Sequence, residues 1–497
     1  MRSLNGAALN PTEAKRLEKL QGSPVTVLQI GEGNFLRGFV DWMIHECRKQ
    51  GLFEGSIAVT QPRPSGKPKI EAFASQEGLY TLVIRGMENG ESVERKELVT
   101  VFSQIFDPYS EWNRMIDLAE SSDLQFIVSN TTEAGLVYRP EPLIEGKAIE
   151  SFPGKIAYLL YRRFMQFSGA ADRGLILLPC ELIERNGDVL RDAVLQYAKD
   201  WEFPEVFQEW VIAHNRFLNS LVDRIVTGYP DKEQADAWFT EWGYKDDMLS
   251  TAEPYHLWAI EAESGMDKLL PFRQAGLNVH WVDDLKPYQQ RKVRILNGAH
   301  TLMTPLGLLH EIDHVRELME NKQIGSFVRE TVLEHIIPTL PYPEDEMKEY
   351  AEAVFERYLN PYIRHRLSDI AMNSLSKFKV RVLPSLAYYA ERGESIPKSL
   401  LTGFAGLLRY YKTKRKGDSF EGYTLKGKSY ILRDDAKALE TIAGIWDEAD
   451  RGSQPIAKTV ECLLKEESLW GQNLSAWNGL TEEVTANLME LMKGELQ

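Results

Sequence analysis

Short runs of β-branched and apolar residues recur along the first half of the chain, and each ends at a glycine, a proline or a polar residue. Residues 25–30 (VTVLQI) form the first run and end at Gly31, and residues 56–60 (SIAVT) form the second. Apolar runs of this length are typical of strands that are buried on both faces of a parallel sheet. The same pattern predicts further strands at residues 79–84, 99–102, 124–129 and 174–178.

Segments with helical spacing lie between these runs. In residues 35–49, Phe39, Met43 and Cys47 recur every fourth position and predict one amphipathic helix. Residues 1–20 are expected to form a short helical arm. Apolar strands that alternate with helices predict an α/β fold around a parallel sheet.

The pattern changes near residue 282. From there to the C-terminus the segments are long and amphipathic, as in residues 344–358 and 456–469, and strand signals become sparse. We therefore expect two domains, an α/β domain over residues 1–281 and a mainly α-helical domain over residues 282–497. A chain of 497 residues is long enough for both.

Composition excludes several classes of function. The formal net charge of −15 disfavours binding to nucleic acid and to anionic membranes, because both require a basic surface. No stretch reaches the roughly 18 apolar residues of a membrane span, and the polar N-terminus lacks the apolar core of a signal peptide. Three scattered cysteines give no disulfide framework. We expect a cytoplasmic protein without a protein partner.

The first run of apolar residues leads into a glycine-rich turn, Gly31-Glu32-Gly33-Asn34-Phe35. Glycines between a strand and a helix allow a tight turn and the close approach of a pyrophosphate to the backbone. The fingerprint is incomplete, because Leu36 stands where its third glycine would fall. A plain strand-to-helix turn has the same appearance, but the strand before and the helix after it favour a dinucleotide site. Gly31, Gly33, Asn34 and Phe35 are the predicted contacts.

The end of the second strand normally contacts the adenosine ribose of a dinucleotide. It reads Thr60-Gln61-Pro62-Arg63 and contains no carboxylate. An acid would have indicated NAD, whereas Arg63 could pair with the 2′-phosphate of NADP. Gln61 is a predicted contact, and the residues themselves leave NAD and NADP open.

Polar residues follow the predicted strand at residues 124–129. Because ligands of open α/β sheets bind at the carboxyl ends of strands, this segment is expected to contact the cofactor. A capped turn would account for the same residues equally well. The predicted contacts are Asn130, Thr131, Thr132 and Glu133.

The densest group of basic residues lies at residues 286–294, with Lys286, Arg291, Lys292 and Arg294. In an acidic chain, an anionic substrate requires such a local cluster. The alternative is an exposed face of a charged helix. Asn186, which follows the predicted strand at residues 174–178, could offer its amide to a substrate oxygen or could simply form a turn.

His310-Glu311-Ile312-Asp313-His314 matches the HExxH pattern of zinc peptidases. That chemistry needs both histidines on one helical face and a third ligand downstream. Pro305 and Gly307 weaken a helix through the motif, and the expected third ligand is missing. No metal site is predicted.

Taken together, these motifs resemble the mannitol dehydrogenase family of long-chain polyol dehydrogenases, over nearly the whole chain. The resemblance implies a Rossmann-like N-terminal domain, a helical C-terminal domain, a site in the cleft between them, NAD as cofactor and catalysis without a metal. It makes Lys292 the general acid/base, Asn297 a hydrogen-bond partner of the reacting oxygen, and His300 a positioning group. The matching segments are IGEGNFLRGF, SNTTEAG, CELIERNG, LVDRIVTGYP, TAEPYHLWAIE and VDDLKPYQQRKVRILNGAH.

Two further points follow from the resemblance. Polyol members carry Asp-Asn where this chain has Glu181-Leu182, so a donor to the substrate carbonyl is missing, or is supplied by Asn186. LVDRIVTGYP and VDDLKPY are similar to the uronate reductase branch, which acts on sugar acids. The predicted substrate contacts are Asn186, Lys286, Arg294 and Lys377. Alternatives are another uronate reductase, a polyol dehydrogenase of the family, or a nucleotide-binding protein without activity.

Overall fold

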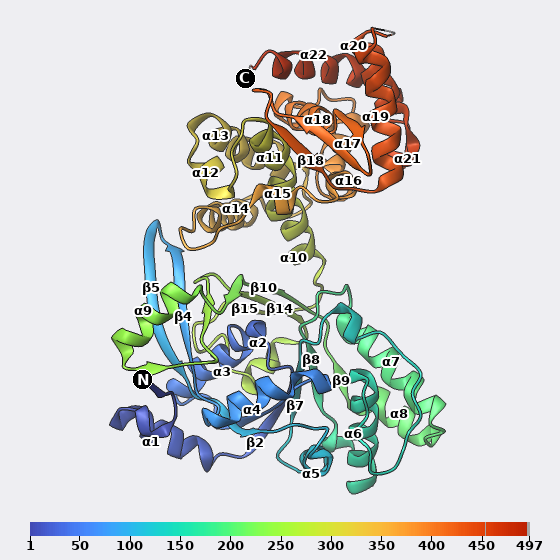
Figure 1. Cartoon of the computed structure of the whole chain (residues 1–497). Helices are drawn as coiled ribbons and strands as arrows, with labels where there is room; N and C mark the ends of the chain where they lie inside the picture. The colour runs from blue at the N-terminus through green and yellow to red at the C-terminus, as the bar shows by residue number, and fades with distance from the viewer. Residues whose placement is uncertain (453, 495–497) are drawn as a thin grey trace. The chain divides into compact units, whose positions relative to one another are not determined.

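The computed structural model describes residues 1–452 and 454–494. The chain divides into two compact units (Figure 1). Unit 1 comprises Met1–Gly86 and Val93–Leu285, and unit 2 comprises Met87–Ser92 and Lys286–Gln497.

Unit 1 contains a six-stranded sheet in which every recorded pair of neighbours is parallel. Numbered along the chain, its strands lie in the order 3-2-1-4-5-6, which is the order of the dinucleotide-binding Rossmann fold. The predicted α/β class is confirmed. Across the sheet the strands are β6 (Phe102–Ile105), β3 (Ser56–Thr60), β2 (Val25–Ile30), β7 (Phe126–Ser129), β8 (Ile176–Pro179) and β9 (Arg216–Phe217).

Helices cover both faces of this sheet, which is why its strands are apolar throughout. Val27 of β2 packs into one core with helices α3 and α4, and its neighbour Leu28 packs into the opposite core with helices α5 to α8. Successive side chains of a strand point to opposite faces, so each apolar run serves two cores. The helices of unit 1 are α1 (Pro11–Gln21), α2 (Asn34–Arg37), α3 (Val40–Lys49), α4 (Lys67–Ser75), α5 (Trp112–Glu120), α6 (Phe152–Gln166), α7 (Asn186–Asp200), α8 (Glu205–His214) and α9 (Lys232–Trp242).

The single helix predicted over residues 35–49 is wrong, because the structure breaks it between α2 and α3. Phe39 leaves the helical region with φ −135° and ψ −87°. A Cβ on Gly38 would lie 2.8 Å from Val226, and Arg224 donates a 2.8 Å hydrogen bond to the Gly38 carbonyl. Close packing of the segment after β10 therefore fixes the break, which periodicity does not reveal.

The predicted strand at residues 99–102 is also wrong, because Val99 ends one strand and Phe102 begins another. The sequence Glu91–Val99 (ESVERKELV) forms a largely exposed hairpin strand that has no apolar run to reveal it. The remaining strands of unit 1 form smaller sheets: β1 (Arg2–Ser3) with β12 (Tyr244–Lys245), then β11 (Val226–Gly228), β13 (Ser250–Ala252), β4 (Tyr80–Glu88) and β5 (Glu91–Val99), and finally β10 (Ser220–Asp223), β14 (Leu257–Glu261) and β15 (Val279–Val282).

Unit 2 is mainly helical, as predicted, and the helix expected at residues 344–358 is confirmed. The helix expected over residues 456–469 is split at Glu466, which is extended and caps the following turn. The helices are α10 (Lys286–Arg291), α11 (Asn297–Leu309), α12 (Val315–Glu320), α13 (Lys322–Glu330), α14 (Glu344–Tyr358), α15 (Leu367–Ile370), α16 (Ser374–Arg381), α17 (Leu383–Glu391), α18 (Lys398–Tyr410), α19 (Ala436–Asp450), α20 (Ile456–Lys465), α21 (Glu467–Trp470) and α22 (Leu480–Met492).

A small antiparallel sheet within unit 2 was not predicted. It consists of β16 (Thr413–Lys416), β17 (Ser419–Tyr423) and β18 (Ser429–Leu432). Its strands are short and largely polar, so they lack the apolar runs that mark the strands of unit 1. Across the described part of the chain, none of the helices combines the length and the apolar character that crossing a membrane requires.

Candidate functional site

The turn after β2 joins three strand ends at the carboxyl edge of the parallel sheet. Gly31 has φ +129°, a conformation that favours glycine. Its N–H donates to the Thr60 carbonyl at 2.9 Å, and a Cβ on Gly31 would lie 3.1 Å from the Asn130 carbonyl oxygen. Glycine is therefore required here by the packing of the chain itself.

Gly33 differs from Gly31 in this respect. It has φ −67°, which any residue can adopt, and a Cβ placed on it would meet no described atom within 4 Å. Neither backbone conformation nor internal packing explains a glycine at this position. Open space in front of a backbone at the start of a helix is what the close approach of a pyrophosphate requires.

Asn34 and Phe35 follow directly. The Asn34 Oδ1 accepts a 2.5 Å hydrogen bond from the buried Arg37, and Phe35 stacks on Phe39 with ring centroids 5.0 Å apart. Both residues are thus held at the edge of the sheet by contacts with their own helical segment. Their predicted role as cofactor contacts stays a prediction.

Glu181 organises the end of β7. Its carboxylate accepts hydrogen bonds from the Thr131 N–H at 2.8 Å, from the Thr131 hydroxyl at 3.0 Å and from the Ser129 hydroxyl at 3.1 Å. Burial raises the pKa of Glu181 against the effect of these donors. Asn130 donates to the Cys180 carbonyl at 2.9 Å. Asn130 and Thr131 are therefore tied to the next strand, and their side chains support the edge.

Thr132 and Glu133, the other two residues predicted in this segment, are exposed. Thr132 has φ +80°, a left-handed conformation that is unusual for a β-branched residue. Strained backbone of this kind is frequent at ligand sites. The two residues begin the turn that lines the pocket described next.

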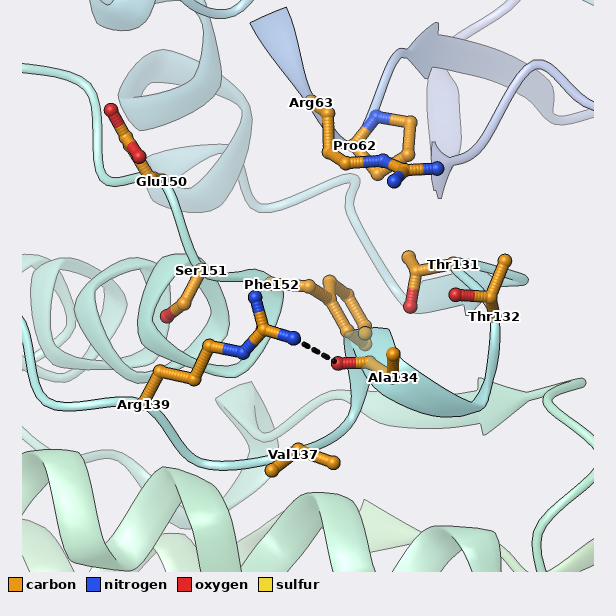
Figure 2. Close-up of a pocket in the computed structure, with 11 residues that line it drawn as sticks. Pro62, Arg63, Thr131, Thr132, Ala134, Val137, Arg139, Glu150, Ser151 and Phe152 are labelled. Carbon is orange, nitrogen blue, oxygen red and sulfur yellow. Dashed lines mark hydrogen bonds between the residues drawn. The ribbon is translucent and has the colours of Figure 1, made fainter.

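A small pocket, open to solvent, lies beside the ends of β3 and β7. Figure 2 shows Arg63 from the β3 side and Arg139 from the facing loop as its two basic residues, and Arg139 donates to the Ala134 carbonyl at 3.5 Å. Its position is that of the adenosine part of a dinucleotide in an open α/β sheet. Its lining comprises Pro62, Arg63, Thr131, Thr132, Ala134, Gly135, Val137, Arg139, Glu150, Ser151 and Phe152.

A buried lysine braces the same pocket from below. The Lys155 ammonium donates to the Pro62 carbonyl at 3.1 Å, to the Glu150 carbonyl at 2.8 Å and to the Tyr109 hydroxyl at 2.9 Å. Burial lowers the pKa of Lys155 to about 7. Two of its three acceptors are backbone atoms of pocket residues, so Lys155 fixes the width of the pocket.

Gln61 lies at the end of β3. Its side chain is fully buried, and the amide donates to Asp107 at 2.5 Å. Asp107 also accepts from the Tyr109 N–H and from Ser110, and these hydrogen bonds help to lower its pKa. Gln61 therefore positions the loop after β6, while its buried Oε1 has no hydrogen-bond partner among the described residues. Its role as a cofactor contact stays a prediction.

Asn186 is bound to the backbone around it. Its side-chain nitrogen donates to the carbonyls of Pro179, Glu181 and Ser220 at 3.0–3.1 Å, and its oxygen accepts from the N–H groups of Gly187 and Ser220. All the hydrogen-bonding capacity of the amide is used by backbone groups, and 1% of the residue is exposed. Asn186 cannot replace the donor missing at Leu182, whose side chain is exposed at the sheet edge.

In unit 2, Lys292, Asn297 and His300 lie on a continuous helical segment in which a π-helical turn, η6 (Lys292–Leu296), joins α10 to α11. At about 100° per residue, an α-helix would turn Asn297 about 140° away from Lys292. The Asn297 N–H instead donates to the Lys292 carbonyl, five residues back. The wider turn brings Asn297 over Lys292, and His300 follows one α-helical turn later. The three predicted residues therefore share one side of the helix.

His300 is buried between two other rings. Its centroid lies 4.5 Å from that of Tyr358 and 4.9 Å from that of His365. Tyr358 donates a 2.6 Å hydrogen bond to the carbonyl of Leu296, the last residue of the π-turn. The His300 Nε2 is buried and has no hydrogen-bond partner among the described residues. An unsatisfied ring nitrogen beside Asn297 is suited to a polar ligand.

Four basic side chains lie around His300. Burial first, and then the charges of His365, Arg357, Arg381 and Lys377, lower the pKa of His300 well below its usual value. The imidazole is therefore neutral near pH 7. Several cations converging on one buried group create a positive potential that favours an anion.

The other predicted substrate contacts are placed differently. Arg294 donates to the Arg381 carbonyl at 3.2 Å, to Thr339 at 3.0 Å and to Ser385 at 2.5 Å, so its guanidinium largely braces the π-turn. Lys286 is exposed at the start of α10. Lys377 belongs to the group around His300, and its Nζ donates to the Ile370 carbonyl at 2.8 Å.

Sequence reasoning missed Arg357, Tyr358, His365 and Arg381. They lie 57 or more positions beyond His300, and only the fold brings them together. One local signal was present for Arg381, because it follows Lys377 by four positions and such residues share a helical face.

The HExxH pattern does not lie on a helix. Helix α11 includes Pro305 but ends at Leu309, and Glu311 has φ +64°. The His310 ring contacts the Leu306 carbonyl at 2.8 Å, and His314 lies 3.3 Å from Glu317. The two histidines thus lack the common helical face that the peptidase chemistry requires.

Comparison with known proteins agrees with this architecture. Residues 25–273 match the Mannitol dehydrogenase Rossmann domain, and residues 284–492 match the Mannitol dehydrogenase C-terminal domain. The altronate oxidoreductase of Halalkalibacterium halodurans is 41% identical over 473 residues, which cover 95% of this chain and 91% of that protein. The altronate oxidoreductase of Bacillus subtilis is 42% identical over 465 residues, 94% of this chain and 92% of that protein.

Solved structures show the same fold. The ternary complex of Pseudomonas fluorescens mannitol 2-dehydrogenase with NAD and D-mannitol has a TM-score of 0.62 at 20% identity, covering 96% of this chain and 93% of that chain. A substrate-free D-sorbitol dehydrogenase has a TM-score of 0.72 at 20% identity, covering 95% and 93%. Both matched domains and the long relatives lead to one conclusion: the chain belongs to the mannitol dehydrogenase family.

Proposed function

We propose that the protein is an NAD-dependent oxidoreductase that reversibly reduces D-tagaturonate to D-altronate. The observation that carries the proposal is the group of basic side chains around His300, on the helix that also bears Lys292 and Asn297. Relatives at 41% and 42% identity that are named altronate oxidoreductase support the choice of substrate.

The carboxyl edge of unit 1 fits a dinucleotide. Gly33 leaves space that the chain does not fill, and the pocket beside Arg63 lies at the strand end where such sheets bind the adenosine group. Gly31, Gly33, Asn34 and Phe35 would hold the pyrophosphate, and residues 130–133 would border the remainder. When bound, NAD supplies hydride to the substrate carbon, or accepts it in the reverse direction.

In this proposal, residues of unit 2 transfer the proton that accompanies the hydride. In the proposed mechanism the Lys292 ammonium donates a proton to the carbonyl oxygen during reduction, and the amine takes it back from the hydroxyl during oxidation. The Asn297 amide donates a hydrogen bond to the same oxygen and stabilises the negative charge that develops there. No metal is needed for either step.

His300 orients the substrate in this proposal. Because its imidazole is neutral, one ring nitrogen can donate a hydrogen bond and the other can accept one. Neighbouring hydroxyls of an open-chain sugar need such groups at fixed positions. The Tyr358 ring packs against the imidazole and keeps its orientation.

The positive potential around His300 separates the candidate substrates. A sugar acid has a carboxylate that can pair with these cations, whereas a neutral polyol has no negative charge and cannot form such a pair. Within the family, fructuronate reduction and mannitol-type polyol oxidation are the alternative activities. A reductase that draws on NADH is expected in the cytoplasm, where we propose that the protein acts.

An assay of NADH oxidation by absorbance, with D-tagaturonate, D-fructuronate and D-fructose in parallel, tests the proposal. We expect the highest kcat/KM with tagaturonate. Preference for fructuronate or fructose would retain the reaction type but contradict the substrate. Absence of turnover with all three, under both NADH and NADPH, would contradict the proposed function.

A further inference from the structure

Arg381 ends helix α16, next to the residues proposed to act on the substrate oxygen. Its Nη1 donates to the Thr301 hydroxyl at 3.2 Å, and that hydroxyl donates to the Asn297 carbonyl at 2.9 Å. Thr301 directly follows His300. A Cβ on Gly298 would lie 3.4 Å from the Arg381 carbonyl, so α16 packs against the first turn of α11. The guanidinium is thus linked to the turn that carries Asn297 and His300 through a single intervening side chain, Thr301.

The rest of this guanidinium is not used by the protein. Among the described residues, its Nε and Nη2 make no hydrogen bond, and no carboxylate lies within the 4.0 Å of an ion pair. Nε and Nη2 form the edge of an arginine that pairs with both oxygens of a carboxylate. Burial lowers the pKa of Arg381, but a guanidinium stays charged at neutral pH. Neither atom is among the buried side-chain atoms that lack a partner, so this edge stays accessible to an anion.

Lys377 adds a second positive charge one turn earlier in α16. Burial and the charge of Arg381 lower its pKa, whereas Asp434 acts in the opposite direction. Asp434 accepts hydrogen bonds from the Leu375 N–H and from the Tyr411 hydroxyl, so part of its charge is already used. The two cations together therefore exceed the negative charge near them.

We propose that Arg381 binds the carboxylate of the substrate in a bidentate pair, with Lys377 as the second cation of the same subsite. The subsite selects sugar acids over neutral ketoses and polyols, and Arg381 determines that selectivity. This inference rests on the proposed function, because it assumes a sugar-acid substrate. It adds a residue that no motif in the sequence indicated.

A purely structural role for Arg381 predicts a different outcome. Arg381→Gln can still donate a hydrogen bond to Thr301 but removes the charge, whereas Arg381→Lys keeps the charge and loses the bidentate edge. Lys379→Gln is the matched control, since it removes one positive charge from the same helix without a recorded contact to the α11 turn. If Arg381 only braced Thr301, Gln would be the mildest of its substitutions.

The experiment measures binding by isothermal titration calorimetry to the chain saturated with NAD. The ligands are D-altronate, D-mannonate and the neutral D-mannitol. We expect Arg381→Gln to weaken binding of the preferred aldonate roughly 10- to 100-fold, the usual range for a charge-assisted pair. Arg381→Lys should lose less, Lys379→Gln should stay within twofold, and binding of mannitol should not fall.

Three outcomes would overturn different parts of the proposal. If Arg381→Gln and Lys379→Gln bind the aldonate equally well, or if Arg381→Gln weakens mannitol as much as the aldonate, the subsite is wrong and the proposed function stands. If the wild type prefers mannonate, the substrate named above is wrong and the subsite is tested on mannonate. Binding of mannitol alone overturns both.

Discussion

The two units treat polar side chains in opposite ways. At the carboxyl edge of the sheet in unit 1, Glu181, Thr131 and Asn186 satisfy one another or the backbone. Around the α11 turn in unit 2, the His300 Nε2 lacks a partner and Arg381 lacks an anion among the described residues. In the first region these three side chains are satisfied internally, although the buried Gln61 Oε1 nearby also lacks a partner among the described residues; in the second, a ring nitrogen and a guanidinium edge both stay open.

This difference separates supporting residues from reacting ones. Polar side chains at strand ends are where ligands of α/β folds bind, yet here several of them build the edge, and backbone atoms and Gly33 face the open space. In unit 2 the side chains themselves are available for chemistry. Hydrogen-bond satisfaction distinguishes the two groups better than position in the fold does.

The largest expected effect comes from the reacting region. Lys292→Ala removes the proposed acid/base and should lower kcat by about 10²–10⁴, the usual contribution of proton transfer. NADH affinity, measured by quenching of protein fluorescence, should stay within twofold, because the proposed cofactor residues lie in the other unit. A variant that retains kcat within threefold would show that Lys292 has another role.

The supporting region should respond in stability. Asn186→Ala removes five recorded hydrogen bonds to buried backbone groups, and we expect a loss of about 3 kcal/mol in the free energy of unfolding. Urea denaturation followed by tryptophan fluorescence measures this loss. The folded fraction should keep the KM of the wild type, and a rise in KM without a loss of stability would restore the predicted role in substrate binding.

Gly33→Ala tests the open space at the edge. No described atom lies near the added methyl group, so the fold should be unaffected, but a pyrophosphate approaching the backbone would meet it. We expect NADH to bind roughly tenfold more weakly, a change of about 1.4 kcal/mol. Gly444→Ala, also without a neighbour within 4 Å, is the control and should leave NADH affinity unchanged. If Gly33→Ala binds NADH as tightly as the wild type does, the cofactor does not approach the backbone at this turn.

The smallest effect concerns Arg63, in the pocket shown in Figure 2. Since no carboxylate follows β3, Arg63 is free to pair with a 2′-phosphate. We expect the wild type to bind NADPH in addition to NADH. Arg63→Gln should weaken the affinity for NADPH about tenfold and change the affinity for NADH less than twofold. Calorimetric titration with each cofactor measures these affinities. A wild-type protein that does not bind NADPH would contradict the prediction.

The fold was predictable where burial shapes the sequence. Residues 25–30 are apolar because both faces of β2 are covered, and that run alone reveals the strand. The exposed hairpin strand Glu91–Val99 carries no such mark. The break at Gly38 depends on Val226, nearly 190 positions later, so no local pattern contains it.

The site was predictable in part for the same reason. Lys292, Asn297 and His300 stand close together in the sequence and follow a family pattern. Arg381 reaches them only through the packing of α16 on α11, which residue spacing does not encode. The sequence cannot show that the Asn186 amide binds backbone groups, because a polar residue at a strand end has the same appearance whether it binds a ligand or the backbone.

The π-helical turn at Lys292–Leu296 has a consequence for how this protein can change over generations. The turn holds one residue more than an α-helical turn, so loss of a single codon there would let the segment relax to an ordinary helix without breaking the reading frame. Lys292 and Asn297 would then be four positions apart in an ordinary α-helix, about 40° from one another and still on one face. We therefore expect a one-residue deletion in this stretch to keep the two side chains on one face, whereas a further one-residue insertion that the helix does not absorb would turn Asn297 away by about 100°.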